Sequence, residues 1–345
     1  MPIARARATP ARGRLRRLRP WLLGAYFGVV AVLLAVMARE LDWAGIVAAM
    51  RGMPRDALLA AGAFAVASHL TYSTFDLAGR AYTGHTLGVG RTMATTFVCY
   101  ATTLSLGSLV GGVGLRYRLY ARQGLALGQV TRITALSIAG NWLGYLALAA
   151  LLLSCFANSL VAGAPGEASG SASSAAGAWL APGWWRAAGG AMALVVLGVL
   201  ACSAVGARRR IRARGVDVVV PPPSIVLALL LLAAANWALM AAVVHSLLDG
   251  SVGYEKVLFA LLASAIAGVI THVPAGVGVF EASFGWLLAG SVDSSTLFAA
   301  LLAYRGVYYL VPLAFAALGY LALERSARGM RPGEPRTGVP ASPAR

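Results

Sequence analysis

Long apolar runs follow one another along almost the whole chain, and they limit what it can fold into more than any other feature. A helix of about 20 apolar residues spans the hydrocarbon core of a bilayer and satisfies its own backbone hydrogen bonds there. The apolar runs cover residues 21–38, 57–75, 92–115, 133–156, 187–207, 224–248, 257–270 with 280–290, and 297–323. Only 12% of the residues are charged, against about 25% in soluble domains. The sequence therefore predicts an all-α polytopic membrane protein.

The positive charge of the chain is concentrated in short arginine clusters beside the apolar runs. The net charge is +17, and Lys256 is the only lysine. The clusters lie at residues 1–19, 80–91, 116–132, 208–214 and 325–345. Such clusters mark the cytoplasmic side of a membrane and face anionic lipid headgroups. We expect a cytoplasmic-membrane protein with both termini in the cytoplasm, membrane phospholipid as its partner, and no binding to nucleic acid.

Two of the apolar runs cannot cross the membrane if every basic cluster is cytoplasmic. The run 92–115 has a cluster on each side, so it must enter from the cytoplasm and return. By the same rule, residues 257–290 must enter from outside and return there. Both runs are interrupted, the first by Gly111, Gly112 and Gly114, the second by Pro274, Gly276 and Gly278. We predict about six full spans plus two re-entrant hairpins.

The two halves of the chain read as an inverted-topology repeat. Residues 111–115 align with residues 275–279 when the sequence is shifted by 164 positions, and the same shift aligns Asn141 with Arg305. Paired glycine- or proline-interrupted segments in two such halves point to the binding site of a transporter. The predicted divisions are a basic tail (1–20), a transmembrane domain (21–323) with halves 21–156 and 187–323, a flexible external loop (157–186) and a disordered cytoplasmic tail (324–345).

Charged residues inside the apolar segments are the candidate binding residues, because their insertion in lipid is costly. Glu281 lies nine residues from the outer end of its hairpin arm, and Arg305 lies nine residues into the last run. At 1.5 Å per residue both are about 13 Å deep, which allows them to pair. The pair would serve either lipid translocation or the anchoring of the hairpin, and the residues leave both open.

A second group of charges lies on the cytoplasmic side of the first hairpin. Arg116 and Arg118 are two residues apart and diverge on a helix, whereas Arg118 and Arg122 share a face. A cavity lined by Arg116 and Arg118 would suit an anionic lipid headgroup, with Asp76 balancing their charge. The alternative is that they are ordinary interfacial residues. Cys99, Cys155 and Cys202 lack metal-like spacing, so no metal or cofactor is expected.

The Asp76 region, the Gly-to-Arg-Tyr-Arg segment at 111–118, the Pro-Gly-Phe-Glu segment at 274–281 and the Tyr-Arg…Tyr-Tyr…Pro pattern at 304–312 occur in a definite order. In that order, over residues 20–325, the chain resembles the membrane domain of the lysylphosphatidylglycerol synthetase/flippase (MprF-like) family. It departs from the family at Ala275, where glycine is common. The resemblance implies a lipid flippase that moves a phospholipid, anionic or aminoacylated, between leaflets. Because the chain stops soon after the last run, we expect no aminoacyl-transferase domain and no enzyme activity. The chain would then serve a separate lipid synthetase or move a different envelope lipid.

Two other functions fit the residues as well. A non-catalytic scaffold for an envelope-lipid enzyme would use the 208–214 arginines and the C-terminal tail, and an oligomer is compatible with either function. An intramembrane enzyme would need a nucleophile and a base, for which Ser264 or Ser283 with His272 are the candidates.

Overall fold

The computed structural model describes residues 43–161, 181–207, 209–213, 216–271, 273 and 276–329. The predicted first span (21–38), the basic tail (1–20) and most of the predicted C-terminal tail lie outside the described residues, as does Arg208. The described part is almost entirely helical, which confirms the predicted fold class.

The first half of the described chain runs from α2 to α8. Its elements are α2 (Trp43–Gly52), α3 (Arg55–Ser73), α4 (Phe75–Thr83), α5 (Val89–Leu106), the π-helix η1 (Ser108–Gly114), α6 (Leu115–Arg122), α7 (Leu127–Cys155) and α8 (Ala157–Val161). The second half contains α10 (Pro182–Gly206), β1 (Arg210–Ala213), β2 (Val216–Val219), α11 (Pro223–Leu247), α12 (Tyr254–Thr271), α13 (Val279–Leu287), α14 (Ser294–Tyr304), the π-helix η4 (Arg305–Leu310) and α15 (Val311–Gly329).

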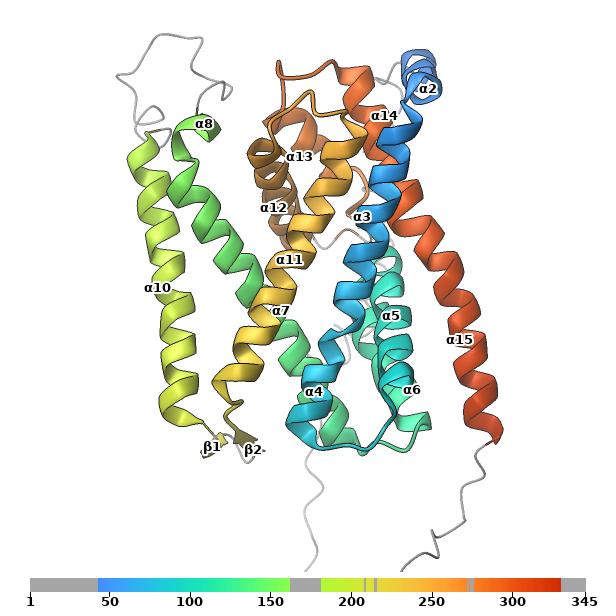
Figure 1. Ribbon diagram of the computed structural model, residues 1–345, viewed down its shortest axis with the longest axis vertical. Helices are drawn as coiled ribbons and strands as arrows, with labels where there is room; N and C mark the ends of the chain where they lie inside the picture. Colours follow the sequence, from blue (N-terminus) through green and yellow to red (C-terminus); the bar gives the residue numbers. More distant parts are fainter. Residues whose placement is uncertain are drawn as a thin grey trace, which may run out of the picture.

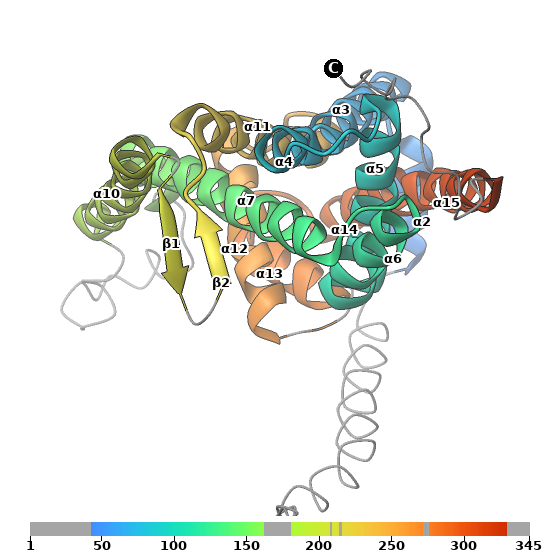
Figure 2. The same cartoon turned by 90° about the horizontal axis from the view of Figure 1, so that it is seen from below.

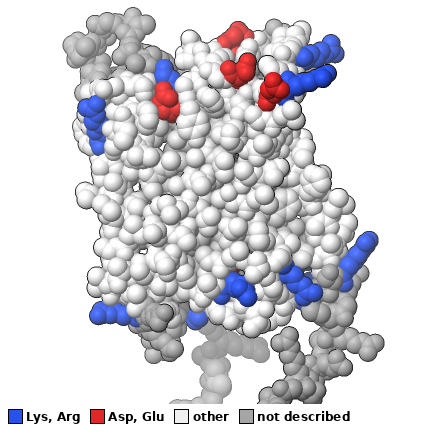
Figure 3. Space-filling model, viewed as in Figure 1, with Lys and Arg blue, Asp and Glu red and all other residues white. Residues whose placement is uncertain are grey.

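Within the described residues, 6 helical stretches are long and apolar enough to cross a membrane. Five of them match predicted spans. The sixth is α12, which the sequence assigned to the first arm of a hairpin. The face shown in Figure 3 agrees with a membrane setting, because its charged side chains lie at the two ends and the band between them shows none.

Two short helical pairs occupy opposite halves of the molecule. In Figure 1, α5 and α6 lie in the lower half, whereas α12 and α13 lie in the upper half. The long helices α3, α7, α10 and α11 pass between the two ends. The first pair is closed at its base, because Gln123 Nε2 after α6 donates to Thr95 Oγ1 near the start of α5 at 2.9 Å. The first pair therefore begins and ends at the same end of the molecule. We call α5–η1–α6 hairpin 1 and α12–α13 hairpin 2.

Three boundaries differ from the predictions. The segment predicted as a loop at 157–186 contains α8 and the start of α10, since Pro182 and the residues after it are helical. The last helix continues to Gly329 instead of ending at 323, so part of the predicted tail is helix. The arginine cluster after α10 includes the antiparallel ribbon β1–β2, which lies beside the ends of α10 and α11 when the molecule is seen from below (Figure 2).

The main core lies around α11 and hairpin 2. Its fully buried side chains include Leu261, Phe284, Leu301 and Tyr304. The helices α7 and α11 approach closely, because a Cβ placed on Gly144 would lie 2.2 Å from the Cβ of Ala233. Small residues at such crossings are typical of membrane helices, where packing replaces the hydrophobic effect.

Candidate functional site

The break in hairpin 1 is a π-helix rather than an extended loop. Gly111 lies against α5 so closely that an added Cβ would be 2.4 Å from the carbonyl carbon of Thr102. Gly112 faces the side chain of Thr103, and Gly114 ends the π-helical segment. The predicted glycines are therefore at the break, and their role is to let the two arms touch.

The break in hairpin 2 uses backbone conformations that favour glycine. Gly276 has φ +60° and Gly278 has φ +81°. Pro274 and His272 lie outside the described residues. The amide of Gly278 donates to Glu281 Oε2 at 2.8 Å, so this carboxylate caps the first turn of α13.

Glu281 and Arg305 form the ion pair that their depths predicted. Arg305 Nε lies 2.5 Å from Glu281 Oε1, and Arg305 Nη2 lies 3.1 Å from Glu281 Oε2, so the contact has two points. The guanidinium also lies over the rings of Phe280 and Tyr309, at 5.8 and 5.4 Å from their centroids. The two side chains remain 16% and 17% exposed. Arg305 begins the π-helix η4, and such irregular turns occur frequently at functional sites.

Asp76 and Arg116 form a second ion pair, which is more deeply buried. Arg116 Nε lies 3.1 Å from Asp76 Oδ2, and the side chains are 4% and 0% exposed. The hydroxyl of Tyr120 donates to the same carboxylate oxygen at 2.8 Å, while Arg116 Nη2 lies 3.4 Å from Ser137 Oγ. This pair joins α6, the returning arm of hairpin 1, to α4.

The predicted cavity lined by both Arg116 and Arg118 is not formed. Arg118 is 54% exposed and pairs with Glu324 on α15 at 3.0 Å, and Arg122 pairs with the same carboxylate. The divergence of Arg116 from Arg118 and the common face of Arg118 and Arg122 are both confirmed. Helical geometry separates the two arginines that the cavity needed, because residues two apart point to different neighbours.

A buried polar cluster, which we call the central cluster, lies where α3, α5, α11 and η4 meet. Ser68 Oγ donates to Asn236 Oδ1 at 2.8 Å and lies 2.6 Å from the hydroxyl of Tyr308. The Tyr308 hydroxyl lies 2.9 Å from that of Tyr100, which accepts from Asn236 Nδ2 at 3.2 Å. His69 packs against the two tyrosine rings. Buried polar groups in a membrane protein usually mark a site or a pathway.

Stacked rings connect hairpin 2 to the central cluster. Phe280 stacks on Tyr304 with centroids 5.5 Å apart, and Tyr304 stacks on Tyr308 at 5.2 Å. Hairpin 1 contributes Tyr100 directly. The ring of Tyr308 is fully buried, and its hydroxyl belongs to the cluster.

The central cluster was not predicted from the sequence, although one pattern in the sequence points to it. The offset of 164 that aligns the glycines also places Tyr72 on Asn236. Tyr72 stacks on Tyr100 with centroids 3.7 Å apart, so both repeat positions lie at the cluster. Helices α3 and α11, which carry them, pack against each other. Polar residues at aligned positions of the two halves, here Tyr72 and Asn236, were the sequence signal for the cluster.

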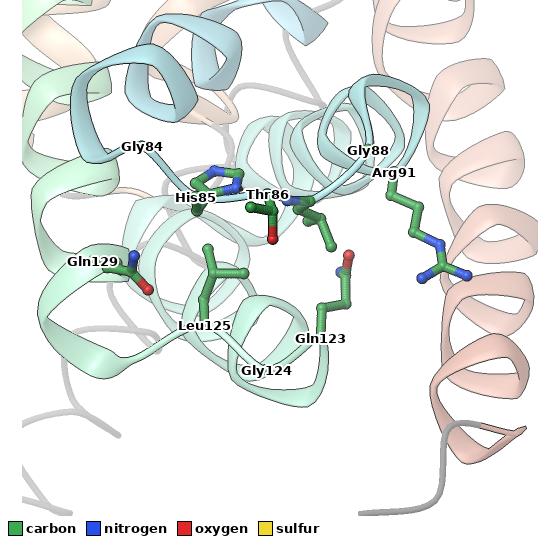
Figure 4. A pocket seen from close by; sticks show the side chains of 10 residues that line it. Gly84, His85, Thr86, Gly88, Arg91, Gln123, Gly124, Leu125 and Gln129 are labelled. Atoms are coloured by element: carbon green, nitrogen blue, oxygen red, sulfur yellow. Dashed lines mark hydrogen bonds between the residues drawn. The ribbon is translucent and has the colours of Figure 1, made fainter. Parts of the chain in front are cut away.

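A separate pocket lies at the base of hairpin 1 (Figure 4), with a volume of about 420 Å³. It is lined by Gly84, His85, Thr86, Leu87, Gly88, Arg91, Gln123, Gly124, Leu125 and Gln129. None of these is acidic. The Leu87 amide donates to His85 Nδ1 at 3.3 Å, and burial lowers the pKa of His85 from its ordinary value, with Arg80 adding to the shift.

The residues proposed for other chemistry are engaged in their own helices. The hydroxyl of Ser264 donates to the Ala260 carbonyl at 2.6 Å, and that of Ser283 donates to the Val279 carbonyl at 2.7 Å. In the part of the chain that the structure describes, no three His, Cys, Asp or Glu side chains gather as metal ligands.

Comparisons with known proteins identify relatives of the whole chain. No protein-family model matches it. The chain is 39% identical over 324 residues to the inner membrane protein YbhN of Escherichia coli (strain K12), which covers 92% of this chain and 94% of that protein. It is 24% identical over 317 residues to the uncharacterized protein slr0712 of Synechocystis sp., covering 90% and 93%. Neither protein is named as a member of the lysylphosphatidylglycerol synthetase/flippase family, so the resemblance to that family stays a prediction.

Proposed function

This chain belongs to the family of the Escherichia coli inner membrane protein YbhN, and we propose that it is a multi-pass inner membrane protein that translocates lipid between the two leaflets. The substrate class we infer is a phospholipid, anionic or aminoacylated, or another envelope lipid with a phosphate-bearing headgroup. No aminoacyl transfer is part of the proposal, although a separate lipid synthetase would be a natural source of substrate.

The distribution of charge supports an orientation. The arginine clusters at 80–91 and 116–132 lie on the lower connections of Figure 1, whereas Asp249, Glu255 and Asp293 lie on the upper ones. The positive-inside rule then assigns the lower end to the cytoplasm. In this orientation hairpin 1 re-enters from the cytoplasm, hairpin 2 re-enters from outside, and α15 ends in the cytoplasm.

One observation carries the proposal: hairpins from opposite ends are both connected to the same buried polar cluster. Hairpin 1 supplies Tyr100 to the cluster, whereas Phe280 of hairpin 2 is connected to Tyr308 through the stacked ring of Tyr304 on α14. In transporters with inverted repeats, broken helices from the two halves form the substrate site near the middle of the membrane, and one half moves against the other. A lipid headgroup needs such a polar route, while its acyl chains stay in the bilayer.

Arg305 is the residue we propose to contact the headgroup phosphate. A guanidinium binds phosphate and carboxylate with the same planar, two-point geometry, so a phosphate can replace Glu281 as its partner. The Glu281–Arg305 pair is partly exposed, which gives a headgroup access to it. The Asp76–Arg116 pair is almost fully buried, and its proposed role is to anchor hairpin 1.

The test is lipid translocation by the purified chain in proteoliposomes. Vesicles contain a phospholipid with a fluorescent headgroup in both leaflets, and dithionite bleaches the outer leaflet only. We expect the wild type to expose the inner-leaflet lipid to bleaching. Arg305→Gln should lose this activity and Arg186→Gln, at an exposed position that contacts Asn158, should keep it. If wild-type vesicles bleach no further than empty ones, the chain does not translocate this lipid class.

A scaffold for an envelope-lipid enzyme is the second candidate, favoured by the β1–β2 ribbon. The ribbon lies at the proposed cytoplasmic end, and Tyr82 at the end of α4 donates to the carbonyl of Val219 in β2. The sequence of this region carries the arginine cluster 208–214, which an acidic partner could bind. Cross-linking from the ribbon in intact membranes would support this function if it captured one stoichiometric partner and the proteoliposomes showed no translocation.

A further inference from the structure

His69 of α3 is a buried histidine in an aromatic cage. Its exposed fraction is 4%, and its ring lies against Phe97 and Tyr100 of α5, with centroids 5.9 and 5.2 Å away. Tyr308 of η4 closes the cage at 4.7 Å. The residue before it, Ser68, is a member of the central cluster. The imidazole therefore lies beside the central cluster, to which hairpin 1 contributes Tyr100.

The tautomer of this imidazole follows from one contact. Nδ1 lies 3.0 Å from the carbonyl oxygen of Ala65, and a carbonyl oxygen only accepts hydrogen bonds. Nδ1 therefore carries a hydrogen, and in the neutral ring Nε2 carries a lone pair. Among the described residues Nε2 has no hydrogen-bond partner. A buried acceptor without a donor is unfavourable, so this atom calls for a proton or a donor group.

We propose that Nε2 of His69 is a proton-binding site that couples lipid translocation to a proton gradient. The coupling rests on the proposed function, whereas the binding of a proton does not. Imidazole is the side chain whose unperturbed charge changes between pH 5 and 8. Protonation adds one hydrogen to Nε2 and one positive charge to the ring, and release of the proton on the other side restores both.

The surroundings accommodate the added charge without a carboxylate. Aromatic rings attract cations, and the rings of Phe97, Tyr100 and Tyr308 lie against the imidazole at tilted or edge angles. The titratable residues among them are Tyr100 from α5 and Tyr308 from η4. On α11 the nearest polar group of the cluster, Asn236, does not titrate. Asp76 and Arg116 neutralise each other, and Asp76 is seven residues further along the chain, or about 10 Å at the helical rise.

Protonation of Nε2 gives the hydrogen-bond network of the central cluster a second arrangement. A protonated Nε2 becomes a donor and needs an acceptor oxygen, and Tyr100 and Tyr308, whose rings contact the imidazole, each carry one. Ser68 gives its one hydrogen to Asn236 Oδ1, so Tyr308 donates to Ser68 and Tyr100 donates to Tyr308, while Asn236 Nδ2 donates to Tyr100. A hydrogen bond from Nε2 to a hydroxyl of this closed ring adds a donor to it and changes the bonds that join α3, α5, α11 and η4. A proton can therefore bias the packing of one repeat half against the other.

The coupling is tested in proteoliposomes with an imposed pH difference. We expect the leaflet ratio of the fluorescent phospholipid in wild-type vesicles to follow the gradient, by at most about tenfold per pH unit if one proton accompanies one lipid. His69→Asn keeps an amide donor for the Ala65 carbonyl but cannot be protonated, so it should translocate lipid without responding to the gradient. The control His245→Asn changes a histidine on α11 that contacts Tyr254 and should respond like the wild type.

The other possible results of these experiments also support or reject the proton site. A wild type that translocates lipid but ignores the gradient overturns it, and so does a His69→Asn variant that responds normally. A variant that is slower at every pH with its gradient response intact assigns His69 to substrate contact instead. If no protein translocates lipid, the proposed function fails, and nitrogen NMR of 15N-histidine-labelled protein in nanodiscs decides. A His69 Nε2 resonance that titrates between pH 5 and 8 supports the proton site, and one that stays constant rejects it.

Discussion

Each hairpin has an ion pair on its returning arm, and the two pairs differ in burial and in the sign of the charge that the arm supplies. In hairpin 1 the returning arm supplies the cation, Arg116, and in hairpin 2 it supplies the acid, Glu281. The first pair is almost completely buried, and Tyr120 donates to its carboxylate. The second pair is partly exposed, and its carboxylate also caps the arm. One hairpin is therefore held by a buried pair, whereas the pair of the other hairpin leaves the guanidinium of Arg305 partly accessible.

Breaking the buried pair should have the largest effect on stability. Asp76→Ala leaves the guanidinium of Arg116 buried without its counterion, which typically costs about 3–5 kcal/mol. We expect a large fall in the thermal unfolding midpoint in detergent, partly recovered when Arg116→Leu is added. Arg118→Gln, at an exposed position, should change the midpoint least. An unchanged midpoint for Asp76→Ala would show that hairpin 1 is held by other contacts.

Removing the charge of Glu281 should destabilise the protein less than Asp76→Ala does, but it should abolish lipid translocation. Glu281→Gln weakens a partly exposed pair and the cap on Gly278, a loss of about 1–3 kcal/mol. Translocation should be lost nonetheless, since Arg305 is left without the partner that a headgroup must displace and restore. The comparison of unfolding midpoint with dithionite bleaching checks both. A variant as destabilised as Asp76→Ala would remove the distinction between the two hairpins.

Adding a methyl group to a glycine should destabilise hairpin 1, whose arms are in close contact, more than hairpin 2. Gly111→Ala places a Cβ 2.4 Å from the backbone of Thr102, so hairpin 1 must open or shift, at about 1–3 kcal/mol. Gly268→Ala in α12 of hairpin 2 meets nothing within 4 Å and should be neutral or slightly stabilising. The unfolding midpoints of the two variants measure the difference. Equal midpoints would contradict the close packing of η1 on α5.

The smallest effect concerns pH at the base of hairpin 1. The pKa of His85 is lowered by burial, so the folded chain keeps this imidazole neutral where the unfolded chain protonates it. Below the ordinary pKa near 6.5 the unfolded state binds the extra proton, and stability falls as the pH falls. Unfolding midpoints measured from pH 7.5 to 5.5 should drop less for His85→Gln than for the wild type. Parallel pH profiles would argue against a buried neutral His85.

Features that depend on the length of a segment or on the spacing of residues along a helix could be predicted from the sequence. Apolar run length predicted the long helices, and equal distance from one membrane surface predicted the Glu281–Arg305 pair, because the helical rise is constant. The spacing of Arg118 and Arg122 predicted their common face.

Features that depend on the rotation of helices about their axes could not be predicted from the sequence. The spans are apolar on all sides, so periodicity does not reveal which face meets a neighbour. The contact of Ser68 with Asn236, and the burial of Arg116 instead of its exposure in a cavity, are set by that rotation. The π-helices η1 and η4 have no hydropathy pattern of their own, and the helical tail to Gly329 follows from the pairing of Glu324 with Arg118.

The opposite entry of the two hairpins is the central claim, and site-specific labelling tests it most directly. Single cysteines at Thr86 and Gly124 mark both ends of hairpin 1, and cysteines at Ser251 and Ser291 mark both ends of hairpin 2. All four positions are exposed. In a chain without its native cysteines, an impermeant maleimide should label Ser251→Cys and Ser291→Cys from outside, and Thr86→Cys and Gly124→Cys only from the cytoplasmic side. Labelling the two ends of either hairpin from opposite sides would contradict the account.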